Sequence, residues 1–280
     1  MAGEQVLAVR MSAMGDVIHC LPAVAALAAR PGVSVTWLVK ERWVPLLRGN
    51  PAVAEILTSH PTRRFDTAYD FQGLMKSAVL ARIGSGQVVG FEDPREWPAQ
   101  WLYSRRVSRH GQHVVDHNLG LVGASGPRRF WLPQGQPEGD LPEQPFVLAS
   151  PLAGWKSKQW PMEHYHRLAA LLPVPLVLNG PPGSGFPHQS SLAGLIDATR
   201  RAAAVVGVDS GPLHLAAALE KPGVAIFGPT SPERNGPYGG SIRVLRVPGT
   251  LTSYKRLDEI DESMRAITPE QVAAALKDVL

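Results

Sequence analysis

The hydrophobic positions of this chain fall into two kinds of segment that follow each other in turn. Short continuous apolar runs, such as residues 6–11 and 33–39, are each followed by a segment with apolar residues at helical spacing, such as residues 17–30. Such short runs are typical of strands buried on both faces, and the segments after them are typical of helices that cross over the sheet. The first half of the chain is therefore predicted to be a parallel, doubly wound α/β unit.

The alternation is interrupted once, by a stretch rich in proline, glycine and charged residues at positions 126–143. After this stretch the apolar runs resume and alternate again with helix-like segments, which predicts a second α/β unit. We therefore expect a first domain over residues 1–140 and a second over residues 141–266.

The last segment, residues 267–280, is predicted to be a separate closing helix. Thr268 is a good N-cap, Pro269 suits the first helical position, and Gln271 stands where a capping-box partner is expected. The apolar residues that follow recur with helical spacing, so the helix is expected to bury one face.

Composition narrows the class of protein. The chain has 280 residues, 44% of them hydrophobic, which is enough for two domains with cores of their own. Its single cysteine, Cys20, excludes an internal disulfide and is typical of a reducing compartment. No apolar run approaches the roughly 18 residues of a membrane-spanning helix, and the first residues lack a secretory pattern. We therefore expect a cytoplasmic protein.

The charge balance is weakly positive, with 28 basic and 24 acidic residues and a net charge of +4. This excess is compatible with an anionic substrate or an anionic membrane surface. It is too small and too dispersed to indicate a nucleic acid partner. No Cys/His spacing of the zinc-binding kind is present. We expect neither nucleic acid nor a metal ion as a partner.

The segment Asp209 to His214 carries the clearest chemical signal. It reads Asp-Ser-Gly-Pro-Leu-His and lies between an apolar run and an Ala/Leu-rich segment with helical character. Asp209 or Ser210 can cap the helix, Gly211 lets a ligand approach the backbone, and the unpaired N–H groups of the first turn favour an anion. His214 can donate to a phosphate. The same residues are equally compatible with a capped turn in which His214 packs in the core.

Three other loops that follow predicted strands hold candidate groups. Thr230 places a hydroxyl after a Gly-Pro pair, Lys156 and Lys158 offer cations to a diphosphate, and Asp16 offers a general base. In parallel sheets such loops share the carboxyl edge, where ligands bind. Each also has an ordinary interpretation, as a tight turn, a solvated lysine or a helix N-cap. The chain contains neither a GxGxxG nor a Walker lysine motif, which argues against dinucleotide oxidoreductases and P-loop enzymes.

The chain resembles the lipopolysaccharide heptosyltransferases, glycosyltransferase family 9, in five segments that occur in order: RMSAMGDVIHCLPAV, DFQGLMKSAVLA, KQWP, DSGPLHLAAALEKPGVAIFGPTSPERNGPYG and ITPEQVAAAL. DFQGLMKSA is most similar to the type I enzymes, which add the first heptose to the Kdo sugar of the inner core. The resemblance implies an α/β protein of GT-B architecture, with two Rossmann-like parallel-sheet domains facing a central cleft. The first domain would bind the acceptor and the second the nucleotide sugar, and the closing helix would return to pack on the first.

The resemblance also implies an activity. It is the inverting, metal-independent transfer of heptose from ADP-heptose to a Kdo acceptor of the Kdo-lipid A type, without a cofactor. The enzyme would be cytoplasmic and would act peripherally at the cytoplasmic face of the inner membrane. Asp16 occupies the position of the general base. The donor-binding positions are Lys158, Asp209, Ser210, Gly211, Leu213, His214 and Thr230, and the acceptor-binding positions are Arg63, Arg64, Gln72 and Lys76.

Two departures from the family pattern leave the choice of nucleobase and sugar open. Ala153 and Gly154 stand where small hydroxylated residues are expected, and the loop after residue 180 lacks the acid that often contacts the ribose. Another GT-B nucleotide-sugar transferase or an epimerase therefore remains an alternative. A non-catalytic protein that binds a nucleotide sugar is a second one, although such a protein has no need of a base at Asp16.

Overall fold

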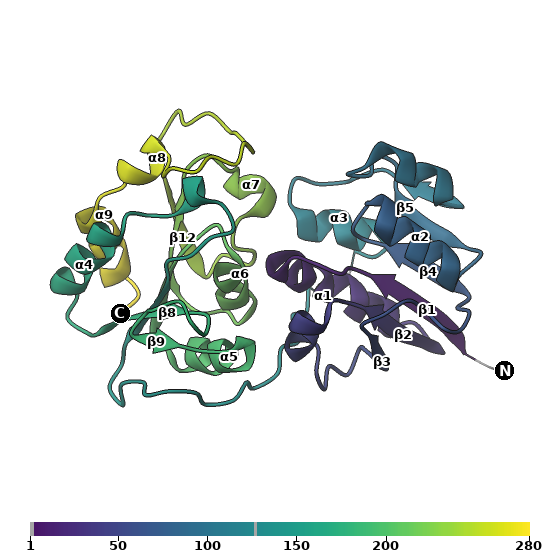
Figure 1. Cartoon of the computed structure of the whole chain (residues 1–280), viewed down its shortest axis with the longest axis horizontal. Coiled ribbons are helices and arrows are strands. Elements are labelled where there is room, and N and C mark those ends of the chain that lie inside the picture. Colours follow the sequence, from purple (N-terminus) through teal and green to yellow (C-terminus); the bar gives the residue numbers. More distant parts are fainter. Residues whose placement is uncertain (1–2, 126–127) are drawn as a thin grey trace. The chain divides into compact units, whose positions relative to one another are not determined.

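The computed structural model describes residues 3–125 and 128–280. It divides into two compact units, Met1–Pro133 and Gln134–Leu280 (Figure 1). The first two residues of the linker predicted at positions 126–143 lie outside the described residues, and the rest of that stretch forms neither helix nor strand. Within the described residues each unit is built around one parallel sheet of six strands. This is the predicted α/β class with two Rossmann-like sheets.

The first sheet has the strand order β3-β2-β1-β4-β5-β6. This order reverses direction between β1 and β4, and ligands of doubly wound folds bind beside such a reversal, at the carboxyl ends of the strands. The loops after β1 and β4 therefore define the first candidate site. The strands are β1 (Glu4–Val9), β2 (Val33–Leu38), β3 (Glu55–Leu57), β4 (Thr67–Asp70), β5 (Val88–Phe91) and β6 (Arg105–Val107).

Helices cover both faces of this sheet (Figure 1). α1 (Met14–Ala28) packs against α3 (Val114–Leu121) and β2, on the face opposite to α2 (Met75–Gly84). The 3-10 helix η2 (Trp97–Leu102) packs beside α2, and a further one, η1 (Glu41–Leu46), follows β2. Alternate side chains of β1 enter the core under α2, as the pleat of a strand requires.

The second sheet repeats this arrangement with the order β12-β11-β10-β7-β8-β9. Its reversal lies between β7 and β10, so the loops after these two strands define the second candidate site. The strands are β7 (Val147–Ser150), β8 (Leu176–Gly180), β9 (His188–Gln189), β10 (Ala204–Val208), β11 (Gly223–Phe227) and β12 (Ile242–Arg246).

Two groups of helices flank the second sheet. α5 and α6 pack together on one face, and α4 and α9 pack together on the other, over the buried side chains of β7, β10 and β11. No helix among residues 3–125 and 128–280 is long and apolar enough to cross a membrane. The helices of this unit are η3 (Lys156–Lys158), α4 (Met162–Leu171), α5 (Leu192–Arg201), α6 (Gly211–Ala218), α7 (Pro232–Asn235), α8 (Glu262–Arg265) and α9 (Pro269–Lys277).

The closing helix α9 begins as predicted, with Thr268 and Gln271 forming a capping box. It belongs to the second unit, where Val272 and Leu276 are fully buried in the core. Its apolar face packs against α4 and β11 of the same unit. The expected packing of this helix on the first unit stays a prediction.

Candidate functional site

The sheet reversal in the second unit brings Lys158 and Asp209 together. Lys158 ends η3 in the loop after β7, and Asp209 follows the last residue of β10. The Lys158 Nζ atom lies 3.0 Å from Asp209 Oδ2, and the side chains are only 14% and 9% exposed. The Trp155 ring also lies beside this ammonium group, with its centroid 4.7 Å from Nζ. Lys156, on the same short helix, is exposed.

Asp209 is held as a carboxylate by its surroundings. Its second oxygen, Oδ1, lies 3.5 Å from Nε2 of His214, which is itself 6% exposed. Burial by itself would raise the pKa of Asp209. The hydrogen bond with His214 and the charge of Lys158 outweigh that effect and lower the pKa well below its ordinary value. A negative group is therefore fixed between two donors at the start of α6.

The first turn of α6 approaches the sheet closely. Ser210 is the N-cap residue, and its Oγ atom is buried without a hydrogen-bond partner among the described residues. Leu213 is buried over Gly207 of β10, where an added Cβ would lie 3.2 Å from the leucine Cβ. The Leu213 side chain therefore anchors the helix, and the N–H groups of the first turn, including that of Gly211, lack partners within the helix.

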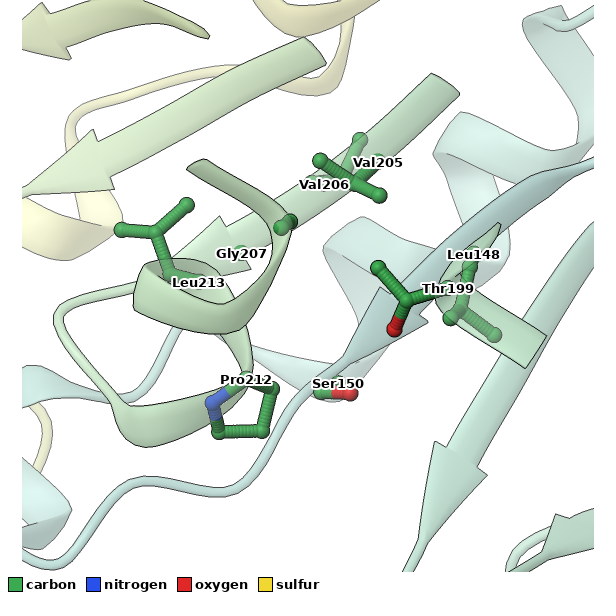
Figure 2. Close-up of a pocket in the computed structure, with 9 residues that line it drawn as sticks. Leu148, Ser150, Thr199, Val205, Val206, Gly207, Pro212 and Leu213 are labelled. Atoms are coloured by element: carbon green, nitrogen blue, oxygen red, sulfur yellow. The ribbon is translucent and has the colours of Figure 1, made fainter. Parts of the chain in front are cut away.

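Figure 2 shows a hollow beneath this turn, with Pro212 and Leu213 on the α6 side and Ser150 and Leu148 on the β7 side. Its volume of about 10 Å³ is at the lower limit for holding one water molecule. The hollow is therefore too small for a nucleotide.

Thr230 stands at the carboxyl edge of the neighbouring strand, three residues after the end of β11. It is 2% exposed, and its Oγ1 atom has no hydrogen-bond partner among the described residues. Buried hydroxyl groups normally have a partner, so an unpaired one marks a position where a ligand atom is expected. Ser210 and Thr230 thus offer two such hydroxyl groups on adjacent strand ends.

The reversal in the first unit positions Asp16. This residue lies in the first turn of α1, where Oδ2 accepts a hydrogen bond of 3.1 Å from the N–H of Ala13. The same oxygen lies 2.6 Å from Nη2 of Arg10, at the end of β1. The Asp16 side chain is 36% exposed, whereas that of Arg10 is 10% exposed. The partly exposed Asp16 carboxylate is thus paired, on its buried side, with the Arg10 guanidinium group.

Gln72, two residues after the end of β4, contacts the loop between β1 and α1. Its Oε1 atom accepts a hydrogen bond of 2.8 Å from the N–H of Met11, and the neighbouring Phe71 carbonyl accepts one of 2.6 Å from Arg10 Nη1. Gln72 is 9% exposed. Because its side-chain oxygen is engaged by the backbone, Gln72 positions the loop that precedes Asp16.

Asp70, the last residue of β4, anchors this strand end from the interior. Its carboxylate accepts hydrogen bonds from Tyr103 Oη at 2.8 Å and Ser77 Oγ at 2.9 Å, and from the N–H groups of Gln72 and Gly73 at 2.9 and 3.2 Å. Burial raises the pKa of Asp70 despite these donors. Tyr103 reaches Asp70 by packing its ring on Gly90, where any Cβ would collide with it.

The other predicted acceptor residues do not all lie at the same edge of the sheet. Lys76 is exposed in the first turn of α2, four residues after Gln72 and near the same sheet edge. Arg63 lies instead over the amino half of the strands, where its Nη2 atom lies 2.6 Å from Glu55 Oε2 and 3.2 Å from Thr36 Oγ1. Arg64 donates to the Ile83 carbonyl at the far end of α2.

Arg63 and Arg64 therefore lie away from Asp16 and Gln72, and their acceptor role stays a prediction. Both lie near the amino ends of β1 and β4, because Arg63 Nη1 lies 3.4 Å from Oε1 of Gln5, the second residue of β1, and both arginines stand shortly before β4 in the chain. Asp16 and Gln72 lie at the opposite, carboxyl ends of the same strands. The two arginines and Gln72 are close in sequence but lie at opposite ends of β4.

A comparison with models of known protein families identifies the family of this chain. A family model described as glycosyltransferase family 9 (heptosyltransferase) matches residues 61–173 and 189–262. The chain belongs to this family. It is therefore a glycosyltransferase, as the five sequence segments predicted. The match includes Lys158 and the segment from Asp209 to Thr230.

Individual relatives of this family 9 enzyme agree with that assignment. Lipopolysaccharide heptosyltransferase 1 of Pseudomonas aeruginosa is 31% identical, over 85% of this chain and 82% of the relative. The enzyme of the same name from Escherichia coli K12 is 29% identical, over 87% and 94%. The solved structure of E. coli heptosyltransferase WaaC with ADP matches with a TM-score of 0.79 and 27% identity, over 99% of this chain and 100% of that one.

Two features of this family 9 enzyme were not predicted from its sequence. The arginine within the first apolar run, Arg10, is the partner of Asp16, and a charge in a buried strand was the signal that could have found it. Asp70 stands at a strand end, as Asp209 does, and its carboxylate accepts a hydrogen bond from the Gln72 N–H.

Burial raises the pKa of the Cys20 thiol to about 12, so this thiol is not a nucleophile at neutral pH.

Proposed function

We propose that this family 9 enzyme transfers heptose from ADP-heptose to a Kdo sugar of an inner-core lipopolysaccharide acceptor. In this proposal the anomeric carbon is inverted and no metal ion takes part. The relatives support this donor and this pathway, because they are lipopolysaccharide heptosyltransferases and two WaaC structures contain ADP or ADP-2-deoxy-2-fluoro heptose. The observation that carries the proposal is the cluster of Lys158, Asp209 and His214 at the start of α6.

The cluster supports donor binding through the charge on the leaving group. As the bond between sugar and phosphate breaks, negative charge grows on the β-phosphate of ADP. Lys158 supplies a positive charge, and the first turn of α6 supplies N–H groups with the positive end of a helix dipole. The Ser210 and Thr230 hydroxyl groups are two further donors with no other partner among the described residues. Donors fixed in advance stabilise such charge without reorganisation, which removes the need for a metal ion.

Asp16 is the proposed general base for the acceptor hydroxyl. Its carboxylate has solvent access, while Arg10 and the Ala13 N–H fix its orientation from one side. General-base catalysis of this kind typically contributes about 10²- to 10⁴-fold in rate.

Inversion is supported by the state of the other carboxylate. Retaining enzymes need a second carboxylate that attacks the sugar and forms a covalent intermediate. Asp209 is only 6% exposed and already engaged by Lys158 and His214, so it is a poor nucleophile. A single displacement, with Asp16 as the only base, inverts the anomeric carbon. Asp209 then serves to orient Lys158 and to contact the donor sugar.

The acceptor side of the proposal rests on Gln72 and Lys76. Gln72 holds the loop that precedes Asp16, and Lys76 offers an exposed cation close to it for the carboxylate of a Kdo sugar. Because such an acceptor is attached to lipid A, the enzyme is proposed to work as a cytoplasmic, peripheral protein at the cytoplasmic face of the inner membrane. Arg63 and Arg64 are not part of this proposal.

Calorimetric titration of the purified protein with nucleoside diphosphates tests the donor assignment. In buffer with EDTA, ADP is expected to bind at least about tenfold more tightly than UDP or GDP, a difference of about 1.4 kcal/mol. Preference for UDP or GDP would contradict the ADP-sugar donor while leaving the transferase class in place. Absence of any binding would reduce the Asp209 to His214 segment to a capped turn.

A further inference from the structure

An exposed apolar surface lies on the first unit, on the helices that follow β4 and β5. Four of the ten large hydrophobic side chains exposed among the described residues belong to α2 and η2, which pack against each other. Trp97 and Trp101 are 62% and 69% exposed, and their rings contact edge to face with centroids 4.6 Å apart. Val79 and Ile83 are 42% and 46% exposed, on the side of α2 that faces away from the sheet. We call these four residues the Trp patch.

The charges around the Trp patch are mostly positive. α2 contains no acidic residue, and neither do residues 97–109. The acidic side chain nearest in sequence to the tryptophans, Glu96, is turned to the backbone, where Oε2 accepts a hydrogen bond of 2.7 Å from the Met75 N–H. The exposed cations on α2 and on the segments flanking η2 are Lys76, Arg82, Arg95, Arg105 and Arg106, against the exposed acids Glu92, Asp93 and Glu96.

We infer that the Trp patch and its cations form a docking surface for an anionic lipid bilayer. Tryptophan combines a large apolar ring with a polar N–H group, and it favours the boundary between lipid tails and headgroups. Lysine and arginine beside it attract anionic headgroups. The combination seen here is that of a surface that lies on a membrane without crossing it.

The position of the patch agrees with this role, and in this respect the inference rests on the proposed function. The N–H of Glu96 donates to the Gly73 carbonyl at 2.8 Å, which ties η2 to the chain directly after Gln72. The start of η2, next to Trp97, is thus held near the carboxyl edge of the first sheet, where Asp16 and Gln72 lie, and the patch extends from there along α2 and η2 toward the amino edge. An acceptor sugar attached to a lipid would be presented at that edge when the patch rests on the bilayer.

The test is co-sedimentation of the full chain with vesicles of phosphatidylcholine containing about 30% phosphatidylglycerol. The wild-type chain is expected to bind, and added salt is expected to weaken the binding. The double variant Trp97→Ser/Trp101→Ser should bind at least about tenfold more weakly, because the buried apolar area is lost. The variant Arg82→Gln/Arg106→Gln should lose about fivefold for each arginine, because Arg82 is exposed on α2 and Arg106 reaches Gln100 of η2.

The matched control is Leu251→Ser, which removes a side chain that is 87% exposed on the second unit. It should bind vesicles like the wild type, and melting curves should show that all variants are folded. Equal binding by the tryptophan variant and the wild type overturns the inference, and so does a wild-type chain that does not bind. A change from dimer to monomer in the tryptophan variant, seen by sedimentation velocity, would assign the patch to a second copy and also overturn it.

The vesicle test uses neither donor nor acceptor, so its outcome is separate from that of the proposed function. Transfer to a water-soluble acceptor that has lost its acyl chains should be the same for the wild type and the tryptophan variant. Vesicle binding without heptose transfer would contradict the proposed function alone, and transfer without vesicle binding would contradict the docking surface alone.

Discussion

Replacing Asp16 by asparagine is expected to lower kcat by about 10²- to 10⁴-fold, with the affinity for ADP unchanged. The amide keeps the shape of the side chain and can still accept the hydrogen bond from the Ala13 N–H. It cannot take a proton from the acceptor hydroxyl, so only the chemical step is affected. The measurement is steady-state transfer with a labelled donor, together with calorimetric titration of ADP.

Asp66 provides the matched control for this variant. Its Oδ2 atom also accepts a hydrogen bond from a backbone N–H, that of Gln5 at 2.7 Å, but at the amino edge of the same sheet. Asp66→Asn should therefore transfer heptose like the wild type. If Asp16→Asn kept more than about a tenth of the wild-type turnover, a general-base role worth at least about 10²-fold would be excluded.

Replacing Lys158 by alanine is expected to weaken ADP binding by about 10- to 150-fold, the effect of losing a hydrogen bond to a charged group. The variant removes the ammonium group proposed to meet the donor phosphates and leaves Asp209 with His214 alone. An unbalanced buried carboxylate beside a diphosphate repels it further. Calorimetric titration of ADP measures the loss directly.

Two further variants test whether the charge of Lys158, and not only its place in the fold, is needed for ADP binding. Lys158→Gln can still donate to Asp209 but carries no charge, so it should fold normally and bind ADP almost as weakly as the alanine variant. Lys156→Ala removes an exposed lysine from the same 3-10 helix and should leave ADP binding unchanged. Wild-type affinity in Lys158→Gln would show that the ammonium charge does not contact the phosphates.

The part of the site that sequence reasoning found is the part fixed by parallel-sheet topology. Asp16 and Lys158 were recognised as groups in loops after strands, and Asp209 as the residue ending a strand. Both sheet reversals lie beside these loops, so the Lys158 and Asp209 side chains meet although 51 residues separate them. The periodicity of apolar residues indicates which loops follow strands of a parallel sheet, and such loops share its carboxyl edge.

The parts that sequence reasoning missed depend on contacts without a periodic signal. Arg10 was visible as a charge within an apolar run, but only the structure shows that its guanidinium group reaches Asp16. Arg63 and Arg64 stand close to Gln72 in sequence, yet β4 separates them by the length of a strand. For α9, the apolar face was predictable, whereas the surface that covers it depends on the shape of α4 and β11.

The most direct test of the account is heptose transfer from ADP-heptose to a Kdo-lipid A acceptor in the presence of EDTA, with the product linkage determined by NMR. We expect one added heptose per acceptor, an anomeric configuration opposite to that of the donor, and a rate that EDTA does not change. A retained configuration, a requirement for a divalent cation, or consumption of the donor without any acceptor would contradict it.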